Sequence, residues 1–326
     1  MKKFYVISLM MFVLCSPPAN AAEIDSVTPR KIRLEDSLET INRIVDQRIQ
    51  QAVKNANAYR EYIEEIDEYL DTDNECNEYV LYSELRKSLF QSYIVSWGLK
   101  GYELDMQFRS LLAGQSYSLS LNDSIYRDID YLEGFSLKLK ELSDVVNIDG
   151  HLVGLDKIGH FFAEGWHYFE LPRDDGQSME EVIEWGRLQE AGKYGYVTTG
   201  VFSYADLTAN LNGWRFWNKV LLDEDDPLKG WIANLFDRPY ISCDIQIIES
   251  VKSMKVVRAW QHNNRFDLSV YIDGAWDEAN NCNSYADPFI EDKVMARIKN
   301  IDAEFCCPIK PVYCRQAGEK YGGSAY

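Results

Sequence analysis

The sequence predicts a mainly α-helical protein, with a helical, bundle-like body followed by a cysteine-rich C-terminal extension of mixed structure. Over the first two thirds of the chain, apolar residues recur every three or four positions, as in amphipathic helices. Beyond about residue 237 the apolar runs shorten, and five of the six cysteines that follow Cys15 lie there. We therefore expect a helical domain over 23–236 and a disulfide-braced extension over 237–326. An extension that wraps around the body is the alternative.

Residues 1–22 have the three parts of a bacterial secretory signal peptide. Lys2 and Lys3 form the charged start, an apolar run follows, and an Ala-Asn-Ala sequence precedes the expected cleavage point. Leu14 is too large for the residue that normally precedes a lipidated cysteine, which argues against a lipid anchor on Cys15. We therefore expect a periplasmic or secreted bacterial protein.

Composition limits the classes of partner. The chain carries 34 basic and 52 acidic residues, a net charge of −18, which disfavours nucleic acid and anionic lipid as partners. After the N-terminal segment, no stretch approaches the roughly 18–20 apolar residues of a membrane span, so no transmembrane helix is predicted. A hydrophobic content of 46% is enough for one large or two modest cores.

Cysteine usage fits an oxidising compartment. Six cysteines remain after Cys15, an even number that favours three disulfides. We expect Cys76 to link the N-terminal helices to the C-terminal third. Adjacent Cys306 and Cys307 are expected to have separate partners, because a bond between neighbours is strained. A zinc knuckle is the rival interpretation, but the paired Cys-x-x-Cys spacing that it needs is absent.

Two amphipathic helices are predicted at the start of the body. The first runs from Leu34 to about residue 70, and its apolar seam of about three heptads favours a core face over a coiled-coil dimer. The second follows a polar break and runs from Tyr79 to Tyr93. The two helices should pack as a hairpin. The other predicted elements are helices at 125–142, 154–170, 178 onward with a Ser178 and Glu181 capping box, 202–222 and 292–301, and strands at 241–248, 256–260 and 266–272.

The helices predicted at 154–170 and 202–222 carry polar groups on otherwise apolar surfaces. At about 100° per residue, the polar residues of each helix share one face. On the first helix these are Asp156, His160, Glu164 and His167, and on the second Ser203, Asp206, Asn210 and Gly213. Acids, an imidazole, a hydroxyl and an amide can therefore meet across a helix pair within an aromatic shell.

Three kinds of chemistry suit this pattern. Carboxylates and imidazoles could hold zinc, manganese or iron, and the candidate metal ligands are Asp156, His160, Glu164, His167 and Asp206. A hydrolase would use His160 oriented by Asp206, with Ser203 as nucleophile, although no Gly-x-Ser-x-Gly elbow is present. The third interpretation is a buried hydrogen-bond network that only fixes helix packing. For Lys157, an outward-pointing side chain is the alternative to a role in the site.

The pattern resembles the VanZ-like family and the related YfiM-like periplasmic proteins, with the signature Asp-Lys-x-x-His-Phe, Glu-x-x-Gln and Ser-x-x-Asp-x-x-Ala-Asn-x-x-Gly. The matching positions are Asp156, Lys157, His160, Phe161, Ser203, Asp206, Ala209, Asn210 and Gly213, with Glu190 near the place of the family glutamate. Lys193 and Gly200 replace the glutamine and an arginine common in the family. The resemblance covers about residues 154–214 and implies a shared polar helix-pair site with an envelope role.

We therefore expect an exported envelope protein with a polar helix-pair site that binds a ligand or a metal. Its partner would be an envelope component or a small ligand, and a divalent metal is the candidate cofactor. The alternatives are a metal-dependent or acid–base hydrolase of an envelope component and a purely structural protein, so the question of enzymatic activity stays open. The candidate catalytic residues are Asp156, His160, Glu190 and Asp206, and the candidate ligand-binding residues are Lys157, Ser203 and Asn210.

Overall fold

The protein is described here by a computed structural model. The described residues are 23–66, 76–90, 92–94, 99–101, 103–130, 132, 137, 142–197, 199–250 and 253–305. The predicted signal peptide and the expected roles of Cys306, Cys307 and Cys314 lie outside these residues. None of the described helices combines the length and the apolar character that a membrane crossing requires.

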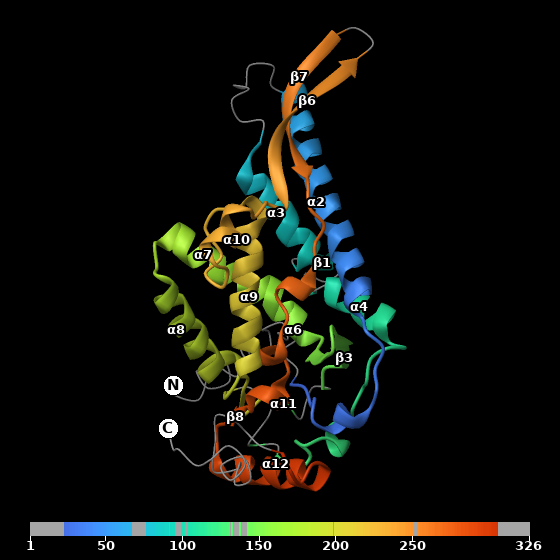
Figure 1. Ribbon diagram of the computed structural model, residues 1–326, viewed down its shortest axis with the longest axis vertical. Helices are drawn as coiled ribbons and strands as arrows, with labels where there is room; N and C mark the ends of the chain where they lie inside the picture. Colours follow the sequence, from blue (N-terminus) through green and yellow to red (C-terminus); the bar gives the residue numbers. More distant parts are fainter. Residues whose placement is uncertain are drawn as a thin grey trace, which may run out of the picture.

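The prediction of a mainly α fold is confirmed (Figure 1). The helical elements are η1 Thr28–Lys31, α2 Leu38–Ile66, α3 Glu78–Leu89, α4 Glu103–Leu112, η3 Leu121–Asp123, α6 Asp156–Gly159, η4 His160–Glu164, α7 Gly165–Asp175, α8 Met179–Gln189, η5 Glu190–Tyr194, α9 Tyr204–Leu221, α10 Trp231–Leu235, η6 Leu268–Val270, η7 Gly274–Trp276, α11 Glu278–Asn281 and α12 Pro288–Ile301. The strands are β1 Ser92–Ile94, β2 Leu99–Gly101, β3 Val145–Ile148, β4 His151–Gly154, β5 Val201–Phe202, β6 Ile241–Ser250, β7 Ser253–His262 and β8 Ser284–Tyr285. They form four antiparallel pairs, β1–β2, β3–β4, β5–β8 and β6–β7.

Helices α2 and α3 form the predicted hairpin. Arg48 Nη1 donates to the carbonyl of Ser88 at 2.6 Å, and Ser88 Oγ donates back to the carbonyl of Arg48 at 2.8 Å. The prediction that the second helix reaches Tyr93 is wrong, because α3 ends at Leu89 and Tyr93 lies in β1. The Ser-Tyr-Ile sequence of β1 combines aromatic and β-branched residues, which suit a strand better than a helix.

The region between α4 and α6 contains turns and a hairpin. Residues 125–128 form turns, and the backbone N–H of Ile125 donates to Asp25 Oδ2 at 3.0 Å instead of entering a helical ladder. Strands β3 and β4 follow, joined at Asp149 and Gly150, whose φ angles are +50° and +84°. An Asp-Gly pair with two positive φ angles is typical of a type I′ turn. The helix predicted over 125–142 is therefore wrong over its first turns.

The C-terminal region packs along the helical body. Strands β6 and β7 form a long hairpin beside α2 (Figure 1). The side chain of Asn57 in α2 donates to the carbonyl of Trp260 in β7 and accepts from its N–H, each at 3.0 Å. The third predicted strand, at 266–272, is wrong: Asp267 caps η6 there by accepting from the N–H of Ser269. Helix α12 begins at Pro288, earlier than predicted, because Asp287 caps it and proline suits the first helical turn.

The predicted disulfide role of Cys76 is confirmed. Cys76 bonds to Cys243, joining the start of α3 to β6 across 167 positions of sequence. Cys282 is also disulfide-bonded. The bundle-like arrangement and the bracing of the whole extension stay predictions.

One aromatic core spans both sides of the predicted boundary at residue 237. Phe161 of η4 lies 5.3 Å from Tyr271 and 5.7 Å from Trp276 between ring centroids, and Phe216 of α9 lies 5.5 Å from Phe266. The three aromatic residues beyond 237 are buried with the helical ones. The region 237–305 therefore contributes to the core of the body.

Two glycines set the distance between the helix pair that carries the motif. A Cβ built on Gly165 would lie 2.5 Å from the Cα of Gly213, and one on Gly213 would lie 2.0 Å from the carbonyl oxygen of Phe161. No side chain fits at this crossing. The close approach brings the polar face of α9 against α6 and η4.

We expect Gly213→Ala to destabilise the protein by about 1–3 kcal/mol, since the new methyl group would push α9 away from η4. Chemical denaturation measures the change. Gly159→Ala is the matched control: its Cβ would have no neighbour within 4 Å, so it should be neutral or stabilising by up to about 1 kcal/mol. Equal effects of the two variants would contradict the close crossing.

Candidate functional site

The centre of the candidate site is Lys157, whose side chain is fully buried. Its Nζ lies 2.8 Å from Asp156 Oδ2, 2.5 Å from Asp206 Oδ1 and 2.6 Å from Glu278 Oε1. An outward-pointing Lys157 is therefore wrong. We call Lys157, its three carboxylates and His160 the Lys157 cluster.

Local structure explains how α6 delivers Asp156 and Lys157. The N–H of Asp156 donates to Ser143 Oγ at 3.2 Å, and the N–H of Leu155 donates to the carbonyl of Asp144 at 2.9 Å. These bonds tie the start of α6 to the irregular segment directly before β3. A Cβ on Gly154 would lie 2.3 Å from Asp156 Oδ1, so the turn from β4 into α6 requires glycine there.

His160 is held between two residues of α9. Its Nε2 lies 3.2 Å from Asp206 Oδ2, and its Nδ1 lies 3.1 Å from Asn210 Oδ1. Both ring nitrogens therefore face oxygen atoms of α9, one from a carboxylate and the other from a side-chain amide. The predicted meeting of the two helix faces thus occurs at His160, Asp206 and Asn210.

Ser203 is the N-cap of α9. Its Oγ accepts from the N–H of Asp206 at 3.3 Å and donates to Glu278 Oε1 at 3.0 Å. The N–H of Ser203 donates to Glu190 Oε1 at 3.0 Å, which places Glu190 at the edge of the cluster. A nucleophilic serine would bond to the histidine, whereas Ser203 is directed to Glu278 and to the helix backbone.

Two predicted metal ligands are turned away from the cluster. His167 is half-exposed and faces Glu170, with Nδ1 and Oε2 3.6 Å apart. Glu164 makes no ion pair with any described residue of the cluster. The cause is η4, a π-helical turn: its extra residue rotates all that follows by about 100° relative to a regular α-helix. The predicted set of Asp156, His160, Glu164, His167 and Asp206 is therefore not assembled as a whole.

The structure tolerates the π turn η4 because a neighbour satisfies its backbone. The indole Nε1 of Trp217 donates to the carbonyl of Phe162, inside η4, at 2.9 Å. The segment η5 is instead kinked at Gly192, whose backbone is not helical, and Glu190 precedes this kink and accepts from the N–H of Ser203. Such π turns are frequent at functional sites, and here η4 supplies His160.

The sequence did not identify two further acids of the site. Glu278, the first residue of α11, supplies the third carboxylate around Lys157. Glu23 is buried near it, where Thr199 Oγ1 donates to Glu23 Oε1 at 2.6 Å. Glu278 lies in a polar stretch without helical periodicity, and no local pattern marks Glu23. Their proximity arises from long-range packing.

Burial and charge divide the acids into two groups. Burial opposes ionisation of Asp206, but the positive charges of His160 and Lys157 outweigh it, and its pKa lies below the usual value. Burial, with the nearby charge of Asp206, raises the pKa of Glu190 well above the usual value, and burial with the charge of Glu278 does the same for Glu23. Burial raises the pKa of Glu278 to about 7, against the effect of Lys157. The site therefore combines an aspartate that ionises readily with glutamates that retain their protons to higher pH.

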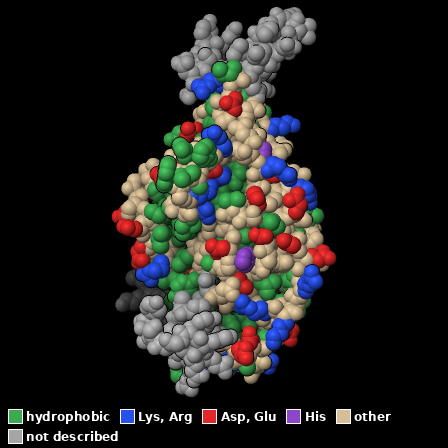
Figure 2. Space-filling model, in the orientation of Figure 1, with side chains coloured by type: hydrophobic (Ala, Val, Ile, Leu, Met, Phe, Trp, Pro, Cys, Tyr) green, Lys and Arg blue, Asp and Glu red, His purple; other side chains and the backbone are tan. Residues whose placement is uncertain are grey.

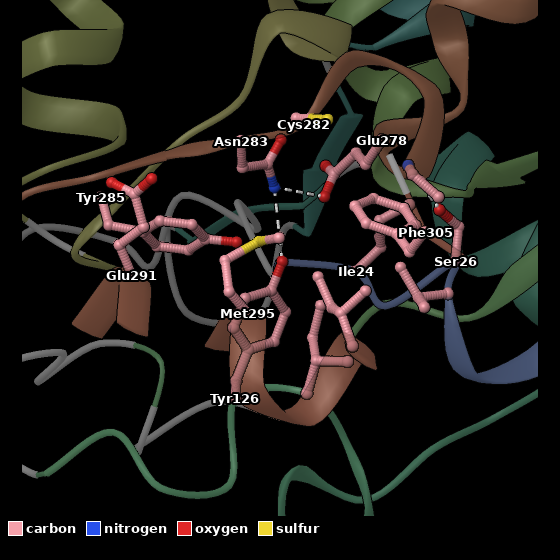
Figure 3. Close-up of a pocket in the computed structure, with 14 residues that line it drawn as sticks. Ile24, Ser26, Tyr126, Glu278, Cys282, Asn283, Tyr285, Glu291, Met295 and Phe305 are labelled. Atoms are coloured by element: carbon pink, nitrogen blue, oxygen red, sulfur yellow. Dashed lines mark hydrogen bonds between the residues drawn. The ribbon is translucent and has the colours of Figure 1, made fainter. Parts of the chain in front are cut away.

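The far side of Glu278 faces a small cavity (Figure 3). Asn283 Nδ2 donates to Glu278 Oε2 at 2.7 Å and to the hydroxyl of Tyr126 at 3.3 Å, and Met295 lies beside them. The cavity volume is about 20 Å³, close to that of one water molecule. It cannot admit an organic ligand, so any ligand must reach the cluster from elsewhere.

In comparisons with known proteins, no family model, curated protein or solved structure matches the chain.

We expect Lys157→Met to destabilise the protein by about 3–5 kcal/mol at neutral pH, because it leaves three buried carboxylates without their cation. Chemical denaturation followed by circular dichroism measures this. Lys87→Met is the control, since Lys87 pairs with Glu84 at 2.6 Å on the surface, and its loss should cost less than about 1 kcal/mol. A Lys157 variant as stable as the control would show that the cluster contributes little.

The raised pKa of Glu278 predicts the direction of a pH effect. The folded state binds the proton of Glu278 more tightly than the unfolded state does, and this difference stabilises the folded protein. The stabilisation is complete below the pKa of the unfolded state, near 4.5, and is lost as the pH rises through the folded pKa of about 7. Melting temperatures should therefore fall between about pH 5 and 8, and Glu278→Gln should flatten this slope.

Glu184→Gln is the control for this pH series. Its hydrogen bond to Arg187 lowers the pKa of the exposed Glu184, so its titration lies below the measured range. The control should keep the wild-type slope, and a wild-type slope in Glu278→Gln would refute the assignment to Glu278.

Proposed function

We propose that this chain is an exported envelope protein, periplasmic or secreted, that binds a divalent metal ion at the Lys157 cluster. In this proposal a bundle-like helical body carries the site, as the resemblance to VanZ-like proteins implies, and a disulfide-braced extension completes it. Support for this division of roles comes from Glu278, which the region beyond 237 contributes to the ion pairs of Lys157.

An excess of carboxylate oxygens is the observation that carries the proposal. Oxygens of Asp156, Asp206 and Glu278 lie within 4.8 Å of one another, and Glu23 and Glu190 are buried nearby. Among the described residues, Asp156 Oδ1 is buried and has no hydrogen-bond donor, whereas Asp206 Oδ1 lies 2.5 Å from the ammonium group of Lys157. A buried acceptor without a donor is costly, and a bound cation would satisfy it.

The pair formed by His160 and Asp206 is the favoured point of entry. Each of these side chains is 10% exposed, whereas those of Lys157 and Asp156 are 1% and 4% exposed. Two ligand atoms bound to one ion at about 2.1 Å are roughly 3.2 Å apart when the angle between them is near 100°. The nitrogen and the oxygen of this pair are 3.2 Å apart, so an ion could replace the shared proton with little movement.

The other two interpretations have narrower support. Hydrolysis would need a free base and a nucleophile, whereas both nitrogens of His160 are engaged and Ser203 bonds to Glu278. A role in packing alone is favoured by Lys157, which already occupies the space between three acids as an internal cation. It does not account for Asp156 Oδ1, a buried acceptor that has no donor among the described residues.

Metal binding is tested by equilibrium dialysis of the purified protein against Zn²⁺ or Mn²⁺, followed by elemental analysis. We expect the wild type to bind about one ion per chain. In His160→Ala and Asp206→Asn the affinity for the metal should fall at least tenfold, as is usual when a metal ligand or a residue that orients a ligand is removed. Binding should weaken as the pH falls, because protons compete for the same atoms.

His262→Ala is the matched control. His262 Nε2 also lies 3.2 Å from an aspartate, Asp46 Oδ1, but the two oxygens of Asp46 accept from the N–H of Phe266 and from Gln50. This second pair lacks the surplus of acceptors, so the control should bind metal as the wild type does. A metal-free wild type, or full binding in His160→Ala, would exclude the proposal.

A further inference from the structure

Helix α10 and its flanks expose a group of large apolar side chains that we call the apolar tip, formed by Leu228, Trp231, Ile232, Leu235 and Phe236. Their exposed fractions range from 55% for Ile232 to 76% for Trp231. Over the place where Figure 1 labels α10, Figure 2 shows apolar and basic side chains gathered together. Isolated exposed apolar residues are ordinary, but five within nine positions mark an interaction surface.

The polar side chains of the same segment point the other way. Asn234 exchanges two hydrogen bonds with the backbone of Asp226, at 3.0 and 3.1 Å, and Asp226 also binds Arg215 at 2.8 Å. Lys229 pairs with Asp237, which pairs with Lys219 at 2.7 Å. A helix in contact with water normally exposes its polar side chains and buries its apolar ones, and α10 does the opposite. The hydrogen bonds of Asn234 and Asp226 hold α10 in the orientation that exposes the apolar side chains.

These contacts define the chemistry of the partner. Positions 230–236, Gly-Trp-Ile-Ala-Asn-Leu-Phe, contain no ionisable residue, and the nearby Lys219 and Lys229 both pair with Asp237. A protein interface usually makes about one hydrogen bond per 100–200 Å². The side chains of the tip offer almost none, because Asn234 is already engaged by Asp226. An uncharged apolar phase that offers no hydrogen bonds is the matching partner.

We propose that the apolar tip inserts into the interfacial region of a zwitterionic lipid bilayer and holds the protein on a membrane surface. Trp231 and Phe236 would enter the boundary between headgroups and acyl chains, where aromatic side chains are favoured. Exposed Asp223, Glu224 and Asp225 immediately precede the segment and would oppose binding to anionic lipid. Lys219 and Lys229, which both pair with Asp237, and the exposed Arg238 set positive charges against these acids, so the rim carries both signs, as zwitterionic headgroups do.

Vesicle flotation tests the proposal with full-length mature protein and vesicles of phosphatidylcholine, alone or with phosphatidylglycerol. We expect the wild type to float with the zwitterionic vesicles and to bind less with the anionic ones. Replacing Trp231 and Phe236 by serine should lower the partition coefficient at least roughly tenfold, since each residue buries apolar surface in the bilayer. Both side chains are exposed, so the double variant should keep its fold, as circular dichroism can check.

The matched control is Tyr79→Ser with Phe289→Ser, which removes two aromatic side chains that are 83% and 73% exposed outside the tip. It should float like the wild type. Three outcomes would overturn the proposal: a wild type that stays unbound, a tip variant that still floats, or binding to anionic vesicles only. Sedimentation that shows a dimer dissociating in the tip variant, without flotation of the wild type, would assign the surface to a second copy of the chain.

Discussion

The architecture of this protein depends on the burial of one ammonium group. An isolated cation inside a protein is unstable, so Lys157 can be fully buried only because Asp156, Asp206 and Glu278 surround it. These acids come from α6, α9 and α11, and each of them would be costly without the lysine. The ion pairs therefore determine which segments must lie together. The aromatic packing around the ion pairs determines how closely these segments approach one another.

Much of the helical framework could be predicted from periodicity and capping. The apolar spacing located α2, and Ser178 with Glu181 forms the capping box that begins α8. The motif helices also face each other through His160, Asp206 and Asn210, as their spacing indicated. The β3–β4 hairpin was missed although Asp149-Gly150 is a strong turn signal, because strands of four residues give too short a pattern of alternation.

The rest of the site could not be found by local reasoning. A regular period of 3.6 residues places Glu164 and His167 beside His160, but the π turn η4 breaks that period. No helical spacing connects Glu23 or Glu278 to residues 156–160, because only tertiary packing brings them near. Lys157 was expected either to bind a ligand or to point outward. Its role as a buried counter-ion could not be predicted, because Asp206 and Glu278 are distant from it in the sequence.

The position of Glu278 in the chain affects how the molecule can reach its native state. Lys157 and Asp206 are synthesised long before Glu278, which completes the ion pairs of Lys157. In the same way, Cys76 is synthesised long before its disulfide partner Cys243. An emerging fragment that ends before α11 holds a lysine with too few counter-charges for burial, which opposes early collapse of the motif helices. The region beyond residue 237 thus supplies both the last counter-charge of Lys157 and the disulfide partner of Cys76.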